Sequence, residues 1–127
     1  MQNWVRTRYY APALGWAVVI LIGTLLPANA LPPAPEWDFL TFDSLVHAII
    51  FGTQLFLLLW ALHKDPSVTL SSLTIFLAFL AVVSFGVGTE FLQGAMPFGR
   101  VTSPVDAISN AVGGVFGLAF WGLSRRF

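Results

Sequence analysis

Four segments of this chain are apolar over the length that an α-helix needs to cross a membrane. They run over about residues 9–26, 43–63, 67–94 and 104–124. About 20 mainly apolar residues in a helix span the hydrocarbon of a bilayer. Only 9 % of the residues are charged, whereas soluble domains carry about 25 %. The sequence therefore predicts an all-α, polytopic membrane protein: a four-transmembrane-helix bundle that forms one domain over residues 1–127.

The basic residues of the short connections predict how the bundle lies in the membrane. If all four segments cross, one side holds Arg6, Arg8, Lys64, Arg125 and Arg126. The acids of the first long connection lie on the other side, where Arg100 is the only cation. Because Lys and Arg are enriched in cytoplasmic loops, we expect both termini in the cytoplasm (N-in, C-in) and both longer connections outside.

The first segment also has features of a secretory signal peptide. Arg6 and Arg8 precede an apolar run, and Ala28-Asn29-Ala30 resembles a small-residue cleavage site. The run is longer than the roughly 7–15 apolar residues of such signals, so we favour a retained span. Under either interpretation the second segment runs from outside to inside.

Composition also argues against several classes of function. The formal net charge is zero, which gives no reason to expect a nucleic-acid partner. The chain has no Cys, and hence no disulfide, thiolate metal site or Cys nucleophile. Its two His, His47 and His63, do not have the spacing of a metal-ligand pair. We expect no cofactor and no resident metal ion.

Polar residues gather at the outer end of three predicted helices. On the second segment, Asp43 and His47 are four residues apart and share one helical face. Asp43 also suits a helix N-cap, and His47 could be satisfied by Asp43 or by a neighbouring helix. Deeper on the same segment, Gln54 is expected to hold helices together through a hydrogen bond.

The third segment contributes a second polar stripe, formed by Gly86, Glu90 and Gln93. A carboxylate about one turn inside a span should not face lipid, because ionisation there costs several kcal/mol. Glu90 is therefore expected to face the bundle interior. It would form a structural bridge with Arg100, or Arg100 would offer its guanidinium to the phosphate or carboxylate of an anionic head group.

The fourth segment opens with Ser103-Pro104-Val105-Asp106, which resembles a capping arrangement in which Asp106 reaches back to the helix start. Asn110 follows one turn later on the same face. Gly113 and Gly117 continue this face as a small-xxx-small surface, on which another helix can pack closely. We favour an internal helix there, because the Asn110 side chain needs a polar partner. Oligomerisation through the Gly113/Gly117 face is the alternative.

Each of these signals is weak by itself, but three helices place polar residues at one depth. The sequence therefore predicts a single polar pocket that faces outward. Its candidate residues are Asp43, His47, Glu90, Gln93, Arg100, Asp106 and Asn110.

The same residues resemble the motifs of VanZ-like membrane proteins. The segment from Asp43 to His47 looks like the first motif of that family. The second and more specific motif is matched by Glu90-x-x-Gln93, by Gly99-Arg100, and by Asp106-x-x-x-Asn110-x-x-Gly113. The resemblance covers about residues 40–120. One departure is Ser44, where the family commonly has Lys, and it makes the outer cluster more acidic.

The resemblance implies a small multi-pass protein of the bacterial plasma membrane. The founding member of the family is associated with low-level resistance to teicoplanin, a lipoglycopeptide that binds cell-wall precursors outside the membrane. The resemblance implies no defined biochemical activity for this chain.

Three functions compete for the predicted pocket. We favour a protein that binds or remodels an anionic envelope lipid or a lipid-linked wall precursor. The second is an enzyme acting on a lipid head group, with Asp43–His47 as base and Glu90 as acid. The third is a non-catalytic structural or scaffold bundle. In a variant, Asp43, Glu90 and Asp106 would hold a divalent ion that bridges the pocket to a phosphate.

Overall fold

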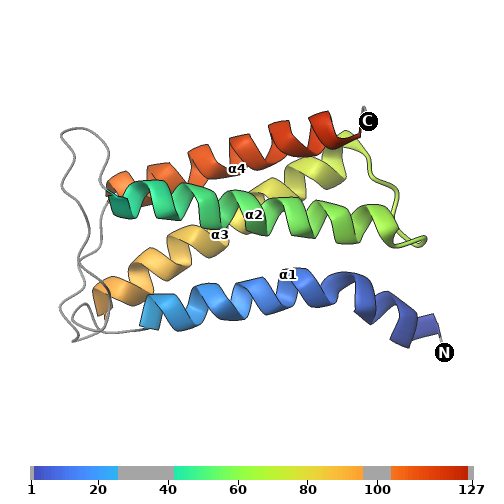
Figure 1. The fold of residues 1–127 in the computed structure, drawn as a ribbon, viewed down its shortest axis with the longest axis horizontal. Helices are drawn as coiled ribbons and strands as arrows, with labels where there is room; N and C mark the ends of the chain where they lie inside the picture. The colour runs from blue at the N-terminus through green and yellow to red at the C-terminus, as the bar shows by residue number, and fades with distance from the viewer. Residues whose placement is uncertain (1, 26–41, 96–103, 126–127) are drawn as a thin grey trace.

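A computed structural model describes the backbone of residues 2–25, 42–95 and 104–125, and the side chains of 4–24, 45–95 and 107–125. These residues form four helices: α1 (Gln2–Leu25), α2 (Phe42–Lys64), α3 (Ser72–Ala95) and α4 (Pro104–Ser124). There is no strand in the described ranges. The predicted all-α class is confirmed. α2 and α4 run in the same direction, α1 and α3 run opposite to them, and α3 crosses behind α2 and α4 obliquely (Figure 1).

Two helices begin at other residues than the sequence predicts. α1 begins at Gln2 instead of about residue 9. α3 begins at Ser72 instead of residue 67, because Ser71 acts as its N-cap: the Ser71 hydroxyl accepts a hydrogen bond from the Thr74 backbone N–H at 3.2 Å. The preceding residues form a separate turn, in which the Val68 N–H donates to the Asp65 carbonyl at 3.1 Å.

Three of the helices are long and apolar enough to cross a membrane. The qualifying segments are Leu45–Lys64, Ser72–Ala95 and Ala107–Ser124. Many large apolar side chains on these helices point away from the bundle; Phe91 and Phe120, for example, are 71 % and 67 % exposed. Such a surface is too apolar for water and suits hydrocarbon. The multi-pass character predicted from the sequence is therefore supported for α2, α3 and α4.

The contact between α2 and α4 is the closest in the bundle and depends on glycine. A Cβ added to Gly113 would overlap the backbone carbonyl of Ala48, and one added to Gly117 would lie 2.6 Å from the Gly52 carbonyl oxygen. The predicted internal helix on the Gly113/Gly117 face is thus α2. The backbone of α2 fills this face within one chain, and oligomerisation of the protein stays an untested prediction.

Apolar side chains from all four helices form the hydrophobic core of the bundle. Leu55 and Leu59 of α2 are fully buried at its centre. The remaining buried members of the core cluster are Ile20, Phe51, Ala78, Val82 and Trp121.

Two hydrogen bonds attach α1 to α2 in the middle of the bundle. Trp16 Nε1 of α1 donates to the Ile50 carbonyl at 2.9 Å, and Gln54 Nε2 of α2 donates to the Ala13 carbonyl at 3.1 Å. The predicted role of Gln54 in joining helices is confirmed. Side-chain donors of this kind hold helices together where the hydrophobic effect cannot.

We predict that Gly113→Ala destabilises the bundle. The new methyl group would force α2 and α4 apart, and overpacking of this kind costs about 1–3 kcal/mol or more. The free energy of unfolding in detergent, measured by far-UV circular dichroism, would report the loss. Gly122→Ala is the matched control on α4, because nothing lies within 4 Å of its added Cβ. Equal stability of the two variants would contradict the packing argument.

Candidate functional site

Three helices bring polar side chains together near one end of the bundle. We call it the polar end: α2 and α4 begin there and α3 finishes there (Figure 1). His47 Nδ1 of α2 lies 3.0 Å from Asn110 Oδ1 of α4 and 3.6 Å from Glu90 Oε1 of α3. We call His47, Glu90 and Asn110 the polar site. They lie far apart in the sequence, and the helix packing alone makes them neighbours.

The polar site is removed from the surface of the bundle. Glu90 is 2 % exposed, Asn110 1 % exposed, and the His47 side chain 14 % exposed. A carboxylate at this depth needs a partner, and the His47 imidazole is placed to supply one. Glu90 thus faces the bundle interior, as its position in an apolar helix requires.

The neighbours of His47 indicate where its ring proton lies. Nδ1 lies near a Glu90 carboxyl oxygen and the Asn110 amide oxygen, and with Glu90 ionised both only accept a hydrogen bond. In that state Nδ1 carries a proton and donates it. If the Asn110 amide were turned over, it would donate to a lone pair on Nδ1, and that lone pair would then repel Glu90. The ring is also stacked on Phe51, with 6.2 Å between ring centroids and 15° between planes.

Asn110 keeps a hydrogen-bond donor inside the protein. Its Nδ2 is buried and has no hydrogen-bond partner in the described part of the chain. The amide packs against α3 at Gly86, where an added Cβ would lie 2.9 Å from Nδ2. Glycine at position 86 makes room for the amide. A buried donor without a partner costs about 1–3 kcal/mol, and no acceptor for Asn110 Nδ2 lies among the described residues.

The other predicted pocket residues divide into two groups. Gln93 is buried on α3, one turn beyond Glu90. The side chains of Asp43, Arg100 and Asp106 lie outside the described residues. Their place in the pocket, their capping roles and the Glu90–Arg100 bridge remain predictions. Among the described side chains, no group of three His, Asp or Glu is placed to hold a metal ion.

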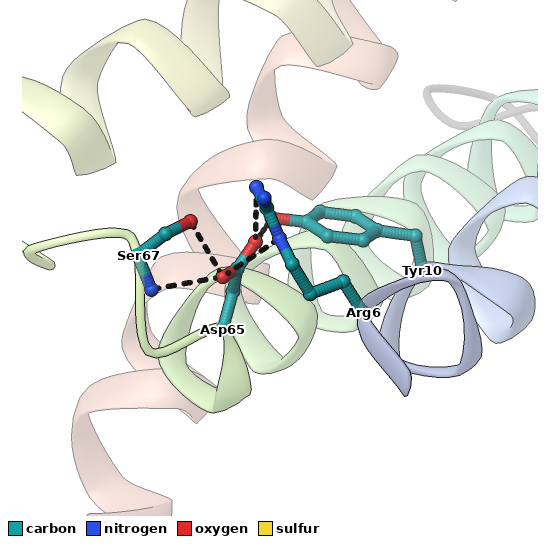
Figure 2. Close-up of polar contacts among 4 residues, drawn as sticks. All are labelled: Arg6, Tyr10, Asp65 and Ser67. Carbon is teal, nitrogen blue, oxygen red and sulfur yellow. Dashed lines mark hydrogen bonds and ion pairs between the residues drawn. The ribbon is translucent and has the colours of Figure 1, made fainter. Parts of the chain in front are cut away.

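A second polar cluster, at the opposite end of the bundle, was not predicted from the sequence. Asp65, 1 % exposed, follows α2 and accepts hydrogen bonds from Ser67 Oγ at 2.7 Å, the Ser67 N–H at 3.0 Å and Tyr10 Oη at 2.8 Å. Arg6 Nε of α1 lies 3.4 Å from the same carboxylate. Figure 2 shows Arg6 and Tyr10 reaching from α1 toward the turn that carries Asp65 and Ser67.

The Asp65 cluster ties α1 to the α2–α3 connection. An Asp that bonds the backbone two residues ahead is a common turn device, so Asp65-Pro66-Ser67 held a local signal for the Ser67 contacts. The contacts with α1 had no such signal, because the sequence does not give the position of one helix relative to another. The two hydrogen bonds from Ser67 are the main reason why the pKa of Asp65 falls to about 2. The hydrogen bond from Tyr10 and the positive charge of Arg6 lower this pKa further.

We predict that acid weakens the attachment of α1. The pKa of Asp65 is lower in the folded protein than its ordinary value of 3.8. The stabilisation is therefore complete above about pH 4 and is lost as the pH falls toward about 2. Asp65→Asn should lower the free energy of unfolding at neutral pH and flatten its dependence on pH in this range. Unfolding in detergent, followed at several pH values, would measure both.

Ser67→Ala provides the companion variant for this test. It removes the Ser67 hydroxyl and keeps the charge of Asp65, so the loss of stability should move to higher pH without disappearing. Identical pH profiles for the wild type and Asp65→Asn would show that Asp65 does not hold α1 in place.

Comparisons with models of protein families, with curated proteins and with solved structures return no match for this chain. The two polar clusters and the apolar surface between them are therefore the features that bear on function.

Proposed function

We propose that this protein is a multi-pass membrane protein that binds the head group of an anionic envelope lipid, or of a lipid-linked wall precursor, at the polar site. The observation that carries the proposal is the buried amide N–H of Asn110, which has no partner in the described part of the chain and lies beside the His47–Glu90 pair. The site offers a donor, an imidazole beside a carboxylate, and an interior shielded from water.

The depth of the polar site supports a lipid head group as its ligand. His47 lies five residues after the start of α2, which is about 7.5 Å along the helix axis. That depth is close to the boundary between head groups and hydrocarbon. Phosphate or carbonyl oxygens of a lipid could accept from Asn110, and His47 in its protonated form would offset the repulsion between such an anion and Glu90.

The resemblance to VanZ-like proteins supports the same proposal. Its two motifs include His47, Glu90 and Asn110, and these residues are neighbours although they come from three helices. A place in the bacterial plasma membrane and a link with teicoplanin resistance belong to the proposal on this ground. Arg100 would add the guanidinium that a phosphate group prefers.

We also propose that α1 is a fourth span and that both termini are cytoplasmic. All four basic residues with described side chains, Arg6, Arg8, Lys64 and Arg125, are exposed and belong to the end opposite the polar site. We call it the basic end. Positive residues favour the cytoplasmic side. The bonds from Trp16 and Gln54 place α1 along α2 through the depth of the bundle.

Single cysteines would test this orientation, because the chain has none of its own. Trp4→Cys and Thr69→Cys, at exposed positions of the basic end, should react with an impermeant maleimide only after cells are permeabilised. Ala95→Cys, at the polar end, should react in intact cells. Labelling of Trp4→Cys in intact cells would contradict the fourth span.

The binding proposal predicts that Asn110→Ala releases an anionic lipid. Losing one hydrogen bond to a charged group costs about 1.5 kcal/mol or more, and hence about tenfold in affinity. Native mass spectrometry would compare retention of phosphatidylglycerol with that of phosphatidylcholine. Gln54→Leu is the matched control, since it also removes a buried amide but lies outside the polar site. Arg100→Ala should weaken retention as well.

Several outcomes of this comparison would count against lipid binding. Unchanged retention in Asn110→Ala, or an equal loss in Gln54→Leu, would remove its support. If the polar-site variants lowered stability without affecting lipid, a scaffold function would be favoured.

A head-group enzyme is the second candidate, because acceptors on Glu90 and Asn110 hold the His47 ring in one tautomer, as a general base requires. Conversion of the retained lipid, visible as a change in its mass, would establish catalysis.

A further inference from the structure

A cluster of nitrogen-bearing side chains lies at the basic end, where α2 and α4 both finish (Figure 1). Arg125 follows α4, and its Nη1 lies 3.4 Å from His63 Nδ1 of α2. Both side chains contact the indole ring of Trp121 on α4. The His63 ring meets it edge to face with 5.5 Å between centroids, and the Arg125 guanidinium carbon lies 5.8 Å from its centroid. We call His63, Trp121 and Arg125 the Trp121 cluster.

The buried indole of Trp121 fixes where the other two side chains lie. Trp121 is 6 % exposed and belongs to the hydrophobic core, where its ring packs against Phe56 at 5.8 Å between centroids. A guanidinium is attracted to an aromatic ring, but the ring supplies no oxygen or nitrogen acceptor for the guanidinium N–H groups. Arg125 is thus held in place while most of its hydrogen-bonding capacity stays open.

The Trp121 cluster presents hydrogen-bond donors. A guanidinium can only donate, so the contact with Arg125 Nη1 requires a lone pair on His63 Nδ1. The ring proton of His63 then lies on Nε2, which has no hydrogen-bond partner among the described residues. The neighbouring Lys64 is exposed, and its ammonium group also only donates. A ligand that fits these groups must carry acceptors, as the oxygen atoms of a phosphate group do.

No carboxylate competes for these donors. The sequence has one acid in the segments that form this end, namely Asp65 within residues 2–10, 60–72 and 118–125. Asp65 is 1 % exposed, and its carboxylate is already occupied by the partners described above. No acid in the described part of the chain pairs with Arg125 or His63. The cluster therefore favours a ligand of net negative charge, because nothing beside it would attract the ammonium of a zwitterionic head group.

The position of the Trp121 cluster along the bundle matches that of lipid phosphates. The apolar part of α2, Leu45–Lys64, has 20 residues and is about 30 Å long. A typical hydrocarbon core is also about 30 Å thick, so His63 lies at its boundary. The apolar part of α4 ends at Ser124, directly before Arg125. Both helices thus bring their donors to the layer of the head groups.

We propose that His63 and Arg125 bind the phosphate of an anionic membrane lipid in the leaflet at the basic end. The guanidinium fork of Arg125 matches two phosphate oxygens, and His63 adds a ring N–H. This site requires that α2 and α4 span the membrane. It does not require head-group binding at the polar site, which lies at the other end of the bundle.

Photolabelling in liposomes would test the phosphate site. The protein would be reconstituted in phosphatidylcholine with a small fraction of phosphatidylglycerol that carries a diazirine on its head group. A phosphatidylcholine with a diazirine on its head group would replace it in a parallel sample. After irradiation, mass spectrometry would locate the label. We expect about fivefold more label on residues 60–64 and 121–125 from the anionic lipid. Equal labelling by the two lipids would overturn the proposal.

Arg125→Gln should lower the phosphatidylglycerol label at the Trp121 cluster about fivefold, because one charge and the fork are lost. Arg8→Gln is the matched control. Arg8 is an exposed arginine of the same end, and its guanidinium carbon lies 5.6 Å from the centroid of Trp4. It belongs to α1, which does not pack against α4 in the described ranges. Its loss should leave the label at the cluster unchanged, and an equal fall in both variants would contradict a defined site.

His63→Phe provides a second variant. It keeps an aromatic ring beside Trp121 and removes both ring nitrogens, so the label should again fall while far-UV circular dichroism stays as in the wild type. If Arg125→Gln does not fold, this variant and the comparison of the two lipids decide. Lower stability with unchanged label in either variant would mean that the cluster only stabilises the helix ends, and the proposal would fail.

Free phosphate is another source of the same chemistry. Inorganic phosphate, added at constant ionic strength, should leave the label unchanged, because the lipid is confined to the layer in which the cluster lies. Loss of the label would show that the site takes the soluble ion and would overturn the lipid assignment. The label is read at the basic end alone. Failure here therefore leaves the Asn110→Ala comparison at the polar site unaffected, and failure there leaves this site unaffected.

Discussion

The close approach of α2 and α4 is the constraint on which the rest of the bundle depends. Gly52, Gly113 and Gly117 let two backbones meet where any side chain would separate them. This contact fixes the register of the helices, and the register sets His47 opposite Asn110 one turn nearer the polar end. The same contact leaves a furrow on the outer surface, walled by the aromatic rings of α4. Three glycines thus determine both the interior polar site and the shape of the outer surface.

The two ends of the bundle solve the problem of buried charge differently. At the basic end, Asp65 is saturated: it has hydrogen bonds from Ser67 and Tyr10, and Arg6 beside it. A carboxylate with this many partners suits a structural role, here the attachment of α1 to the α2–α3 connection. At the polar end, the Glu90 carboxylate and the Asn110 amide oxygen both lie near His47 Nδ1, and the Asn110 amide nitrogen has no partner in the described part of the chain. A buried polar group without a partner calls for an explanation, and a bound oxygen atom is the one proposed for Asn110.

The sequence was sufficient to predict the helices and part of the polar site. Long apolar segments predict helices reliably, and the spacing of Glu90 and Asn110 from their helix ends put them at one depth. It was insufficient wherever the outcome depended on how helices lie side by side. The contact of Asp65 with Arg6 and Tyr10 is an example, since 55 residues or more separate the partners. The start of α3 was predicted about five residues too early, because Ser71 was not recognised as its cap.

Both hydrogen bonds that join α1 to α2 in mid-bundle end on main-chain carbonyls, those of Ala13 and Ile50. Every amino acid carries such a carbonyl, so mutation at either acceptor position leaves the bond intact. Residue proximity is commonly inferred from correlated substitutions. These two bonds should produce no such correlation between donor and acceptor positions. Packing, and not hydrogen bonding, is then what limits the side chains at these two positions, and at Ala13, which is 4 % exposed, it limits them to small ones.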